Sequence, residues 1–287
     1  MASAVHAPAG SELPVQVIRP SRGWGVLDLR ELWRYRELLF VFTWRNVLVR
    51  YKQTVLGIGW ALLQPFFLMV VFSLFFGRVG GLQSRTNGIP YPIFVYVALL
   101  PWTFFQNAVT QSSLSLVGNA NLLRKIYLPR VILPLSTVLT ALVDFAVASV
   151  VLWGLMVYYG EYPEPLRLLV LPALVALAFL TALGVGLLIS ALNVAYRDVQ
   201  YVVPFLVQIW LFASFVATPS NVFPEPWRTI CGLNPMAGVV EGFRWALLGR
   251  GEAPGGLIAI SVAVTLALLA GGALYFRRME RTFADVV

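Results

Sequence analysis

The sequence predicts an all-α integral membrane protein with six transmembrane helices, an amphipathic interfacial helix before them and short re-entrant helices between the last two. Of its 287 residues, 59% are hydrophobic and 12% are charged, and the mean hydropathy is +0.79. A soluble globule of this size could not bury that much apolar surface in one core, so the excess must face lipid. Apolar runs long enough to cross a bilayer recur along the chain, and aromatic residues cluster at their ends, as at membrane interfaces.

Six runs approach the roughly 20 apolar residues that a helix needs to span the hydrocarbon layer. They cover residues 58–77, 92–114, 131–158, 168–193, 202–218 and 257–276. Most of the 21 Lys and Arg residues lie before the first run, between the second and third, between the fourth and fifth, or after the sixth. Because positively charged loops stay in the cytoplasm, both termini are expected there. Residues 1–22 lack the apolar stretch of a signal peptide, which agrees with a cytoplasmic N-terminus.

The segment before the first span is predicted to be an amphipathic helix. Over residues 28–53, apolar and basic side chains alternate at helical spacing, so that the cations would face lipid phosphates. The alternative is an ordinary charged flank of the first span. Residues 1–27 are then a flexible cytoplasmic tail, and residues 54–287 form one six-helix transmembrane domain.

Residues 219–256 are too polar to span a membrane and too apolar for a free loop. Pro226 and the Asn234-Pro235 pair are helix-start signals, so two short helices are expected to fold back into the outer leaflet. Such non-spanning backbone needs protein or a water-filled cavity around it. Glu241 and Arg244 stand at i, i+3 in this segment, where they form either a local ion pair or part of an exit gate.

The sequence carries no recognisable catalytic chemistry. HExxH and GxSxG motifs are absent, and Cys231 is the only cysteine. His6 is the only histidine and lies in the N-terminal tail, so neither a catalytic nor a metal site is expected. The only lysines, Lys52 and Lys125, do not follow glycine, so a Walker A loop is absent. The positive charge is spread over several loops rather than gathered in one patch, which argues against binding of nucleic acid.

Asp144 is the clearest ionisable residue inside a predicted span, and an intramembrane charge is by default functional. It is interpreted either as a gate residue or as a carboxylate hydrogen-bonded to a neighbouring helix. Amide and aromatic side chains in the first two spans are candidates for lining a channel, where flat rings can stack on sugar rings without binding them tightly. Packing between helices is the alternative for each of them. The channel candidates are Trp60, Phe67, Trp102, Phe105, Asn107 and Gln111.

The loop between the second and third spans, residues 118–130, is short, basic and amphipathic. Its apolar edge exceeds what a connector needs and indicates a docking element for a cytoplasmic partner. The docking candidates are Asn119, Asn121, Leu122, Leu123, Arg124, Lys125, Ile126 and Tyr127.

Three stretches resemble the permease subunits of bacterial ABC type-2 exporters, in particular those for O-antigen, capsular or teichoic-acid polymers. The first two are WRNVLVRYKQTVLGIGWALLQP at 44–65 and NANLLRKIYLPRVILPLS at 119–136. The third is RDVQYV at 197–202, followed by LNPMAGVVEGFRWALLG at 233–249. They occur in the family's order and, with the six spans, cover nearly the whole chain from Asp28 onward.

The resemblance implies a homodimer of permeases in the cell inner membrane. Each would bind a separate nucleotide-binding subunit that holds ATP and Mg, so this chain would need no cofactor of its own and would not be an enzyme by itself. Residues 119–130 would be the coupling helix, residues 28–52 the interfacial helix, and the cargo a lipid-linked polysaccharide.

The pyrophosphate of such a cargo would approach the interfacial helix, where Arg45, Arg50 and Lys52 are candidate contacts. Ordinary anchoring to membrane lipids is the alternative for these three cations. An exporter of drugs or other lipids, a proton-coupled secondary transporter and an integral-membrane transferase are the other functions considered.

Overall fold

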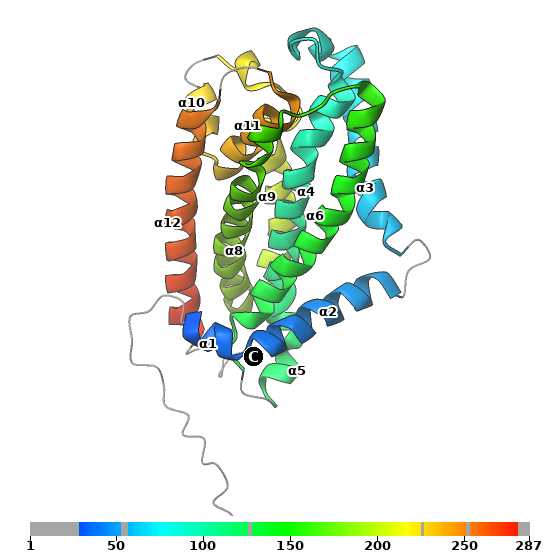
Figure 1. The fold of residues 1–287 in the computed structure, drawn as a ribbon. Helices are drawn as coiled ribbons and strands as arrows, with labels where there is room; N and C mark the ends of the chain where they lie inside the picture. The colour runs from blue at the N-terminus through cyan, green and yellow to red at the C-terminus, as the bar shows by residue number, and fades with distance from the viewer. Residues whose placement is uncertain (1–28, 53–56, 126–127, 225–226, 251–252, 281–287) are drawn as a thin grey trace, which may run out of the picture.

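The computed structural model describes residues 29–52, 57–125, 128–224, 227–250 and 253–280, and every regular element in these ranges is helical (Figure 1). The long helices are α2 (Arg36–Lys52), α3 (Gly59–Phe72), α4 (Tyr91–Ser115), α6 (Ile132–Tyr159), α8 (Leu171–Ala195), α9 (Val199–Ala213), α11 (Pro235–Leu248) and α12 (Gly255–Glu280). The short ones are α1 (Leu29–Arg34), α5 (Ala120–Leu123), α7 (Pro165–Leu168) and α10 (Trp227–Gly232), together with the π-helical η1 (Ser73–Val79) and the 3₁₀ turns η2 (Leu82–Arg85), η3 (Val117–Asn119) and η4 (Ser220–Val222).

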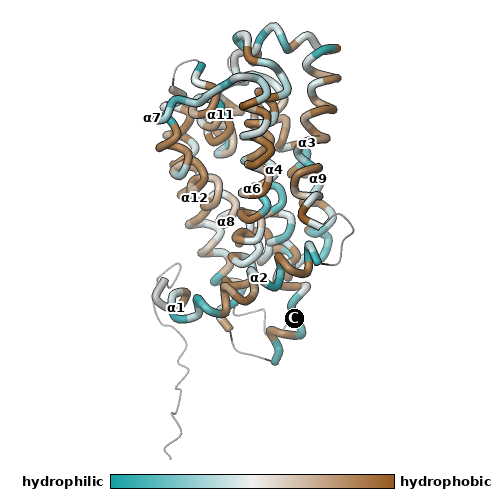
Figure 2. Tube along the Cα trace, turned by 45° about the vertical axis from the view of Figure 1, so that its right-hand side comes forward, coloured by the Kyte–Doolittle hydropathy of each residue, from teal (hydrophilic) through white to brown (hydrophobic). Residues whose placement is uncertain are grey.

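Among the described residues, five helical segments are long and apolar enough to cross a membrane, namely Gly59–Val79, Tyr91–Ser115, Ile132–Tyr159, Pro165–Ala195 and Gly255–Glu280. They match five of the six predicted spans. In the first, α3 runs on into the π-helical turns of η1. Hydropathy mapped on the chain agrees: apolar residues predominate along α8 and α12, whereas hydrophilic segments gather around α1, α5 and the upper loops (Figure 2).

The fifth predicted span, residues 202–218, differs from the structure. Its helix is α9, which has 15 residues and is about 22 Å long, short of the roughly 30 Å hydrocarbon layer. The helix ends at Ala213 because Asn234 binds there: its amide Nδ2 donates to the Ala213 carbonyl at 3.2 Å and to the Ser214 hydroxyl at 2.7 Å. Phe215 follows with φ of +57°, a left-handed conformation that a helix cannot continue.

Helix α4 lies at the centre of the bundle. Within its most apolar stretch, 83% of residues are buried, compared with 17% for the span that contains α3 and 22% for α12. Helices α3, α6, α8, α9 and α11 all pack against α4. The bundle is therefore built around one fully enclosed helix, and the outer helices expose apolar faces.

Helix α12 packs closely against α8 through glycine. A Cβ on Gly272 would stand 2.2 Å from the Gly184 carbonyl oxygen. A hydrogen bond of 2.7 Å between the hydroxyls of Thr181 and Thr265 joins the same two helices. Small residues and hydroxyl pairs are the contacts that hold membrane helices together, because lipid offers no hydrophobic driving force between them.

The segment between the fifth and sixth predicted spans contains α10 and α11. As the sequence indicates, Asn234 caps α11: its side-chain oxygen accepts from the Met236 backbone N–H at 3.0 Å, and Pro235 occupies the first helical position. The position of these helices in the outer leaflet stays a prediction.

Candidate functional site

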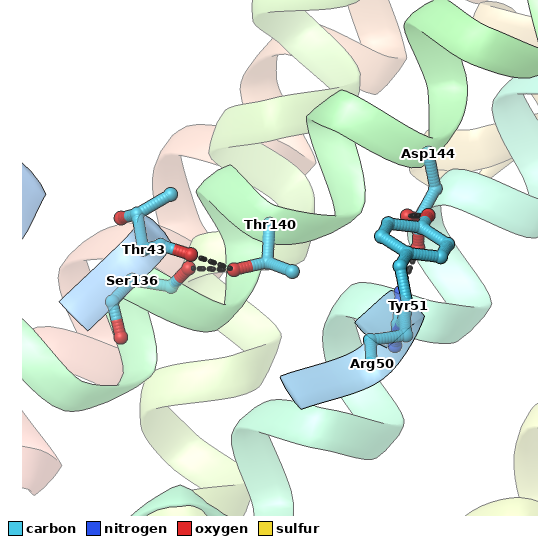
Figure 3. A network of polar contacts seen from close by, with 6 residues as sticks. All are labelled: Thr43, Arg50, Tyr51, Ser136, Thr140 and Asp144. Atoms are coloured by element: carbon cyan, nitrogen blue, oxygen red, sulfur yellow. Dashed lines mark hydrogen bonds and ion pairs between the residues drawn. The ribbon is translucent and has the colours of Figure 1, made fainter. Parts of the chain in front are cut away.

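Helix α2 crosses the lower part of α6 and forms a charged contact with it (Figure 1). Arg50 forms an ion pair with Asp144 of α6, and the Tyr51 hydroxyl donates to the other carboxylate oxygen. Asp144 is 7% exposed. Figure 3 shows both α2 side chains directed at the carboxylate. Asp144 is thus hydrogen-bonded to a neighbouring helix, and its charged partner lies 94 residues earlier in the sequence.

Neutral polar contacts continue the α2–α6 junction toward its other end. The Asn46 amide donates to the Ser136 hydroxyl at 3.3 Å, and the Thr140 hydroxyl donates to the Thr43 carbonyl at 3.5 Å and to the Ser136 carbonyl at 2.8 Å (Figure 3). Ser136, Thr140 and Asp144 recur every four residues and so share one face of α6. This spacing was the sequence signal for the junction, and the sequence analysis missed it.

Burial shifts the pKa values of Arg50 and Tyr51 at the end of α2. It lowers the pKa of the Arg50 guanidinium, an effect that the adjacent Tyr51 opposes. It also raises the pKa of Tyr51, against the effect of Arg50. The guanidinium has lost much of its hydration, and the Asp144 carboxylate replaces part of it.

A cavity of about 290 Å³ opens beside this ion pair, between the end of α2 and helices α3, α4 and α6. Its wall combines charge, amides and aromatic faces. Neither Gln64 nor Asn107 forms a hydrogen bond with another described residue, so both amides are available to a ligand. The principal lining residues are Arg50, Tyr51, Trp60, Gln64, Thr103, Phe104, Asn107, Asp144 and Phe145. One headgroup candidate, two channel candidates and one gate candidate from the sequence thus meet in one cavity.

The remaining channel candidates separate into two groups. Phe67 of α3 is 56% exposed, and Gln111 is half-buried. Trp102 and Phe105 are both 0% exposed. The first donates its indole N–H to Gln106 at 3.1 Å, and the second stacks edge-on against Trp210 with ring centroids 5.1 Å apart. These last two residues therefore pack inside the protomer, which corrects their assignment to a channel.

The headgroup candidates of α2 have different surroundings. Arg45 reaches the loop before α5: its guanidinium donates to the Asn119 side-chain oxygen at 3.0 Å and lies 4.9 Å from the centroid of the Phe42 ring. Arg50 is bound to Asp144, and Lys52 is exposed. Arg45 and Lys52 are thus both exposed, and of the three candidates only Arg50 is held in an ion pair.

The predicted docking loop is less open than expected. Leu122 and Leu123 pack against the hydrophobic core, which corrects the expected exposed leucine edge. Asn121, Arg124 and Lys125 are exposed. Ile126 and Tyr127 lie outside the described residues, as does the predicted tail at 1–27. Within the described part of this loop, the fully exposed side chains are therefore polar or basic, and the two leucines are partly buried.

The gate candidates Glu241 and Arg244 form the local ion pair, at 3.0 Å. Arg244 is 5% exposed, lies 3.7 Å from the centroid of the Phe94 ring and donates to the Val216 carbonyl at 2.8 Å. It therefore holds the non-helical residues 214–218 against α4, at a place separate from Asp144. No group of three potential metal ligands occurs in the described ranges.

Comparison with known proteins agrees with this architecture. Residues 37–248 match the family described as ABC-2 type transporter. The chain is 30% identical to the O-antigen export system permease protein RfbA of Myxococcus xanthus, over 90% of this chain and 98% of the relative. It is 26% identical to RfbA of Klebsiella pneumoniae, over 88% and 95% of the two chains. Identity to the polysialic acid transport protein KpsM of Escherichia coli is 27%, over 85% and 93%. The chain is a multi-pass membrane protein that belongs to the ABC-2 type transporter family.

Proposed function

We propose that this chain is the permease subunit of an ATP-binding-cassette exporter that moves a lipid-linked, O-antigen-like polysaccharide across the cell inner membrane. The observation that carries this is similarity over nearly the full length to permeases named for O-antigen export. The cavity beside Asp144 supports the choice of cargo. Amides and a carboxylate next to flat aromatic faces are suited to hydroxyl-rich rings. Lys52 is exposed two residues after Arg50 of the cavity wall and carries charge suited to a pyrophosphate.

The proposed topology has six crossings, with both termini in the cytoplasm. Arg130, just before α6, donates to the backbone carbonyl of Glu280 at the end of α12, which brings these two ends to one side of the bundle. Helix α9 then provides the remaining crossing together with residues 214–218. Backbone that is not helical is tolerated at membrane depth only inside protein or beside water. In agreement, Phe215 and Val216 are 0% exposed.

A homodimer with a channel between the protomers accounts for the short α9. A 15-residue helix is poorly suited to face lipid alone, and its outer face carries large apolar side chains. Trp60 and Phe67 of α3 are exposed aromatics that would line the channel. The exposed large hydrophobic residues of α9 are Tyr201, Val202, Phe205, Leu206, Ile209 and Phe212.

The partner would be a separate nucleotide-binding subunit that holds ATP and Mg. It would dock on η3 and α5, where Asn121, Arg124 and Lys125 are exposed. The bond from Arg45 to Asn119 links this loop to α2, and the Arg50–Asp144 pair links α2 to α6. Movement of the ATPase would therefore be transmitted to the cavity wall through the Arg45–Asn119 hydrogen bond and the Arg50–Asp144 ion pair.

The test is affinity purification of the tagged chain from its native membrane in mild detergent, with ATPase activity measured on the eluate. We expect co-purification of a Walker A subunit. Reversing the exposed docking charges, as Arg124→Glu with Lys125→Glu, should release it. Arg197→Glu, an exposed cation on another predicted cytoplasmic loop, is the matched control and should retain it. Purification of this chain alone, with export persisting in vesicles without ATP, would support a secondary transporter instead.

Cargo is tested separately, by transport in vesicles that contain the permease and its ATPase. An ATP-dependent export of lipid-linked polysaccharide supports the proposal. Export of drugs or short lipids without the polysaccharide would assign the chain to the alternative exporter class.

A further inference from the structure

A second cavity lies on the opposite side of Phe145 from the polar one. It has a volume of about 640 Å³ and forms a slot between α6 and α8, with α4 and α11 at its base. Leu100, Leu152 and Leu247 at the base are at most 2% exposed, whereas Trp153 on the α6 wall is 45% exposed. The slot therefore begins at the outer surface of the bundle and reaches its core.

The lining of the slot offers water little. Apart from the indole N–H of Trp153 at the exposed rim, its polar side chain is Ser149, whose hydroxyl already donates to the Phe145 carbonyl at 2.8 Å. Apolar cavities stay dry, and an empty space of this size forfeits the contacts of every atom in its wall. Because α6 and α8 are membrane-spanning segments, the medium outside the slot is lipid hydrocarbon. Hydrocarbon is therefore the filling that the lining favours.

The length of the slot matches one lipid leaflet. Along α6 it runs from Leu142 to Trp153, about 17 Å at 1.5 Å per residue, and along α8 from Leu171 to Phe179, about 12 Å. Half of the roughly 30 Å hydrocarbon layer is about 15 Å. The slot lies toward α7 and α11, which is the outer leaflet in the proposed orientation.

A cation stands at the outer end of the slot. Arg167 directly precedes Leu168 of the slot wall, pairs through Nε with Glu164 at 2.8 Å and lies 5.1 Å from the centroid of the Trp245 ring. Its Nη1 is buried and has no hydrogen-bond partner among the described residues. The Arg167 side chain as a whole is 22% exposed, so the open part of its guanidinium, rather than the enclosed Nη1, can donate to a phosphate oxygen at the outer end of the slot.

We propose that this slot is a binding site for one glycerophospholipid, with an acyl chain between α6 and α8 and the phosphate at the exposed part of the Arg167 guanidinium. The bound chain would pack on the face of Phe145 opposite the polar cavity and so support the residue next to Asp144. The site depends on the membrane-spanning assignment and is independent of which cargo is exported.

The test is photo-crosslinking of the full chain in native-like membranes with phosphatidylglycerol that carries a diazirine in its acyl chain, with adducts mapped by peptide mass spectrometry. We expect adducts on the α6 and α8 walls of the slot. Ala176→Trp fills the slot and should reduce them to background, and Ala176→Phe is the milder variant if the first does not fold. Ala173→Trp, exposed on α8 outside the slot, is the control and should leave the adducts unchanged.

A second arm tests the phosphate contact. Diazirine phosphatidylglycerol should label the slot more strongly than a diazirine fatty alcohol, and Arg167→Gln should remove that difference, whereas Arg250→Gln in a neighbouring loop should retain it. Labelling that persists in both Ala176 variants would overturn the site. Competition by a polyprenyl phosphate but not by phosphatidylglycerol would overturn the phospholipid as its occupant, and equal labelling by both probes would overturn the role of Arg167.

Discussion

The ion pair between Arg50 and Asp144 should contribute measurably to the stability of the α2–α6 junction. Asp144→Asn removes the carboxylate charge that accepts from both Arg50 and Tyr51. Hydrogen bonds to charged groups contribute about 1.5–3 kcal/mol each, and breaking a buried pair costs about 3–5 kcal/mol. The Arg50 side chain is 29% exposed and can regain some hydration. We therefore expect a loss of about 2–3 kcal/mol, below the fully buried range.

The assay is a double-mutant cycle with Asp144→Asn, Arg50→Gln and the combined variant, followed by unfolding of the purified protein through its intrinsic tryptophan fluorescence. If the two side chains act together, the combined variant should be little less stable than either single one, with a coupling energy close to the single loss, about 2–3 kcal/mol. Arg124→Gln, an exposed cation on the nearby loop, should change stability by less than about 0.5 kcal/mol. Strictly additive losses in the cycle would refute the pairing.

Three further predictions concern packing elsewhere in the bundle. Gly272→Ala places a Cβ against the backbone of α8 and should lower the free energy of unfolding, measured by thermal unfolding, by about 1–3 kcal/mol. Gly271→Ala is the control, because a Cβ there meets nothing within 4 Å and should not destabilise the protein. Equal effects of the two substitutions would contradict the close contact. Arg244→Gln removes the charge that holds residues 214–218 and should cost about 3 kcal/mol, with increased proteolysis of that segment as the readout; an unchanged cleavage pattern would argue against this role. Asn234→Ala removes both the α11 cap and the hydrogen bond to the end of α9, and it should lower the free energy of unfolding by about 1–2 kcal/mol. Asn234→Asp keeps the capping oxygen and should recover part of this loss. If Asn234→Asp were no more stable than Asn234→Ala, the capping role would be contradicted.

The sequence by itself determined the membrane class, five of the spans and the start of α11. These follow from features that are local in the chain: the length of an apolar run and the capping chemistry of Asn234 and Pro235. The short α9 was not predictable from its own residues, because what ends it is the side chain of Asn234, 21 residues downstream of Ala213. An apolar run of 17 residues says only that the segment avoids water.

Tertiary structure alone decided which apolar and polar residues face inward. In a membrane protein, the lipid-facing and packed faces of a helix are both apolar, so periodicity does not separate Trp60, which is exposed, from Trp102, which is buried. The partner of Asp144 was equally hidden, since Arg50 lies 94 residues earlier and its sequence context indicates a contact with the pyrophosphate of the cargo or with membrane lipids. Buried charges require partners wherever the fold can supply them, and only the crossing of α2 over α6 brings this pair together.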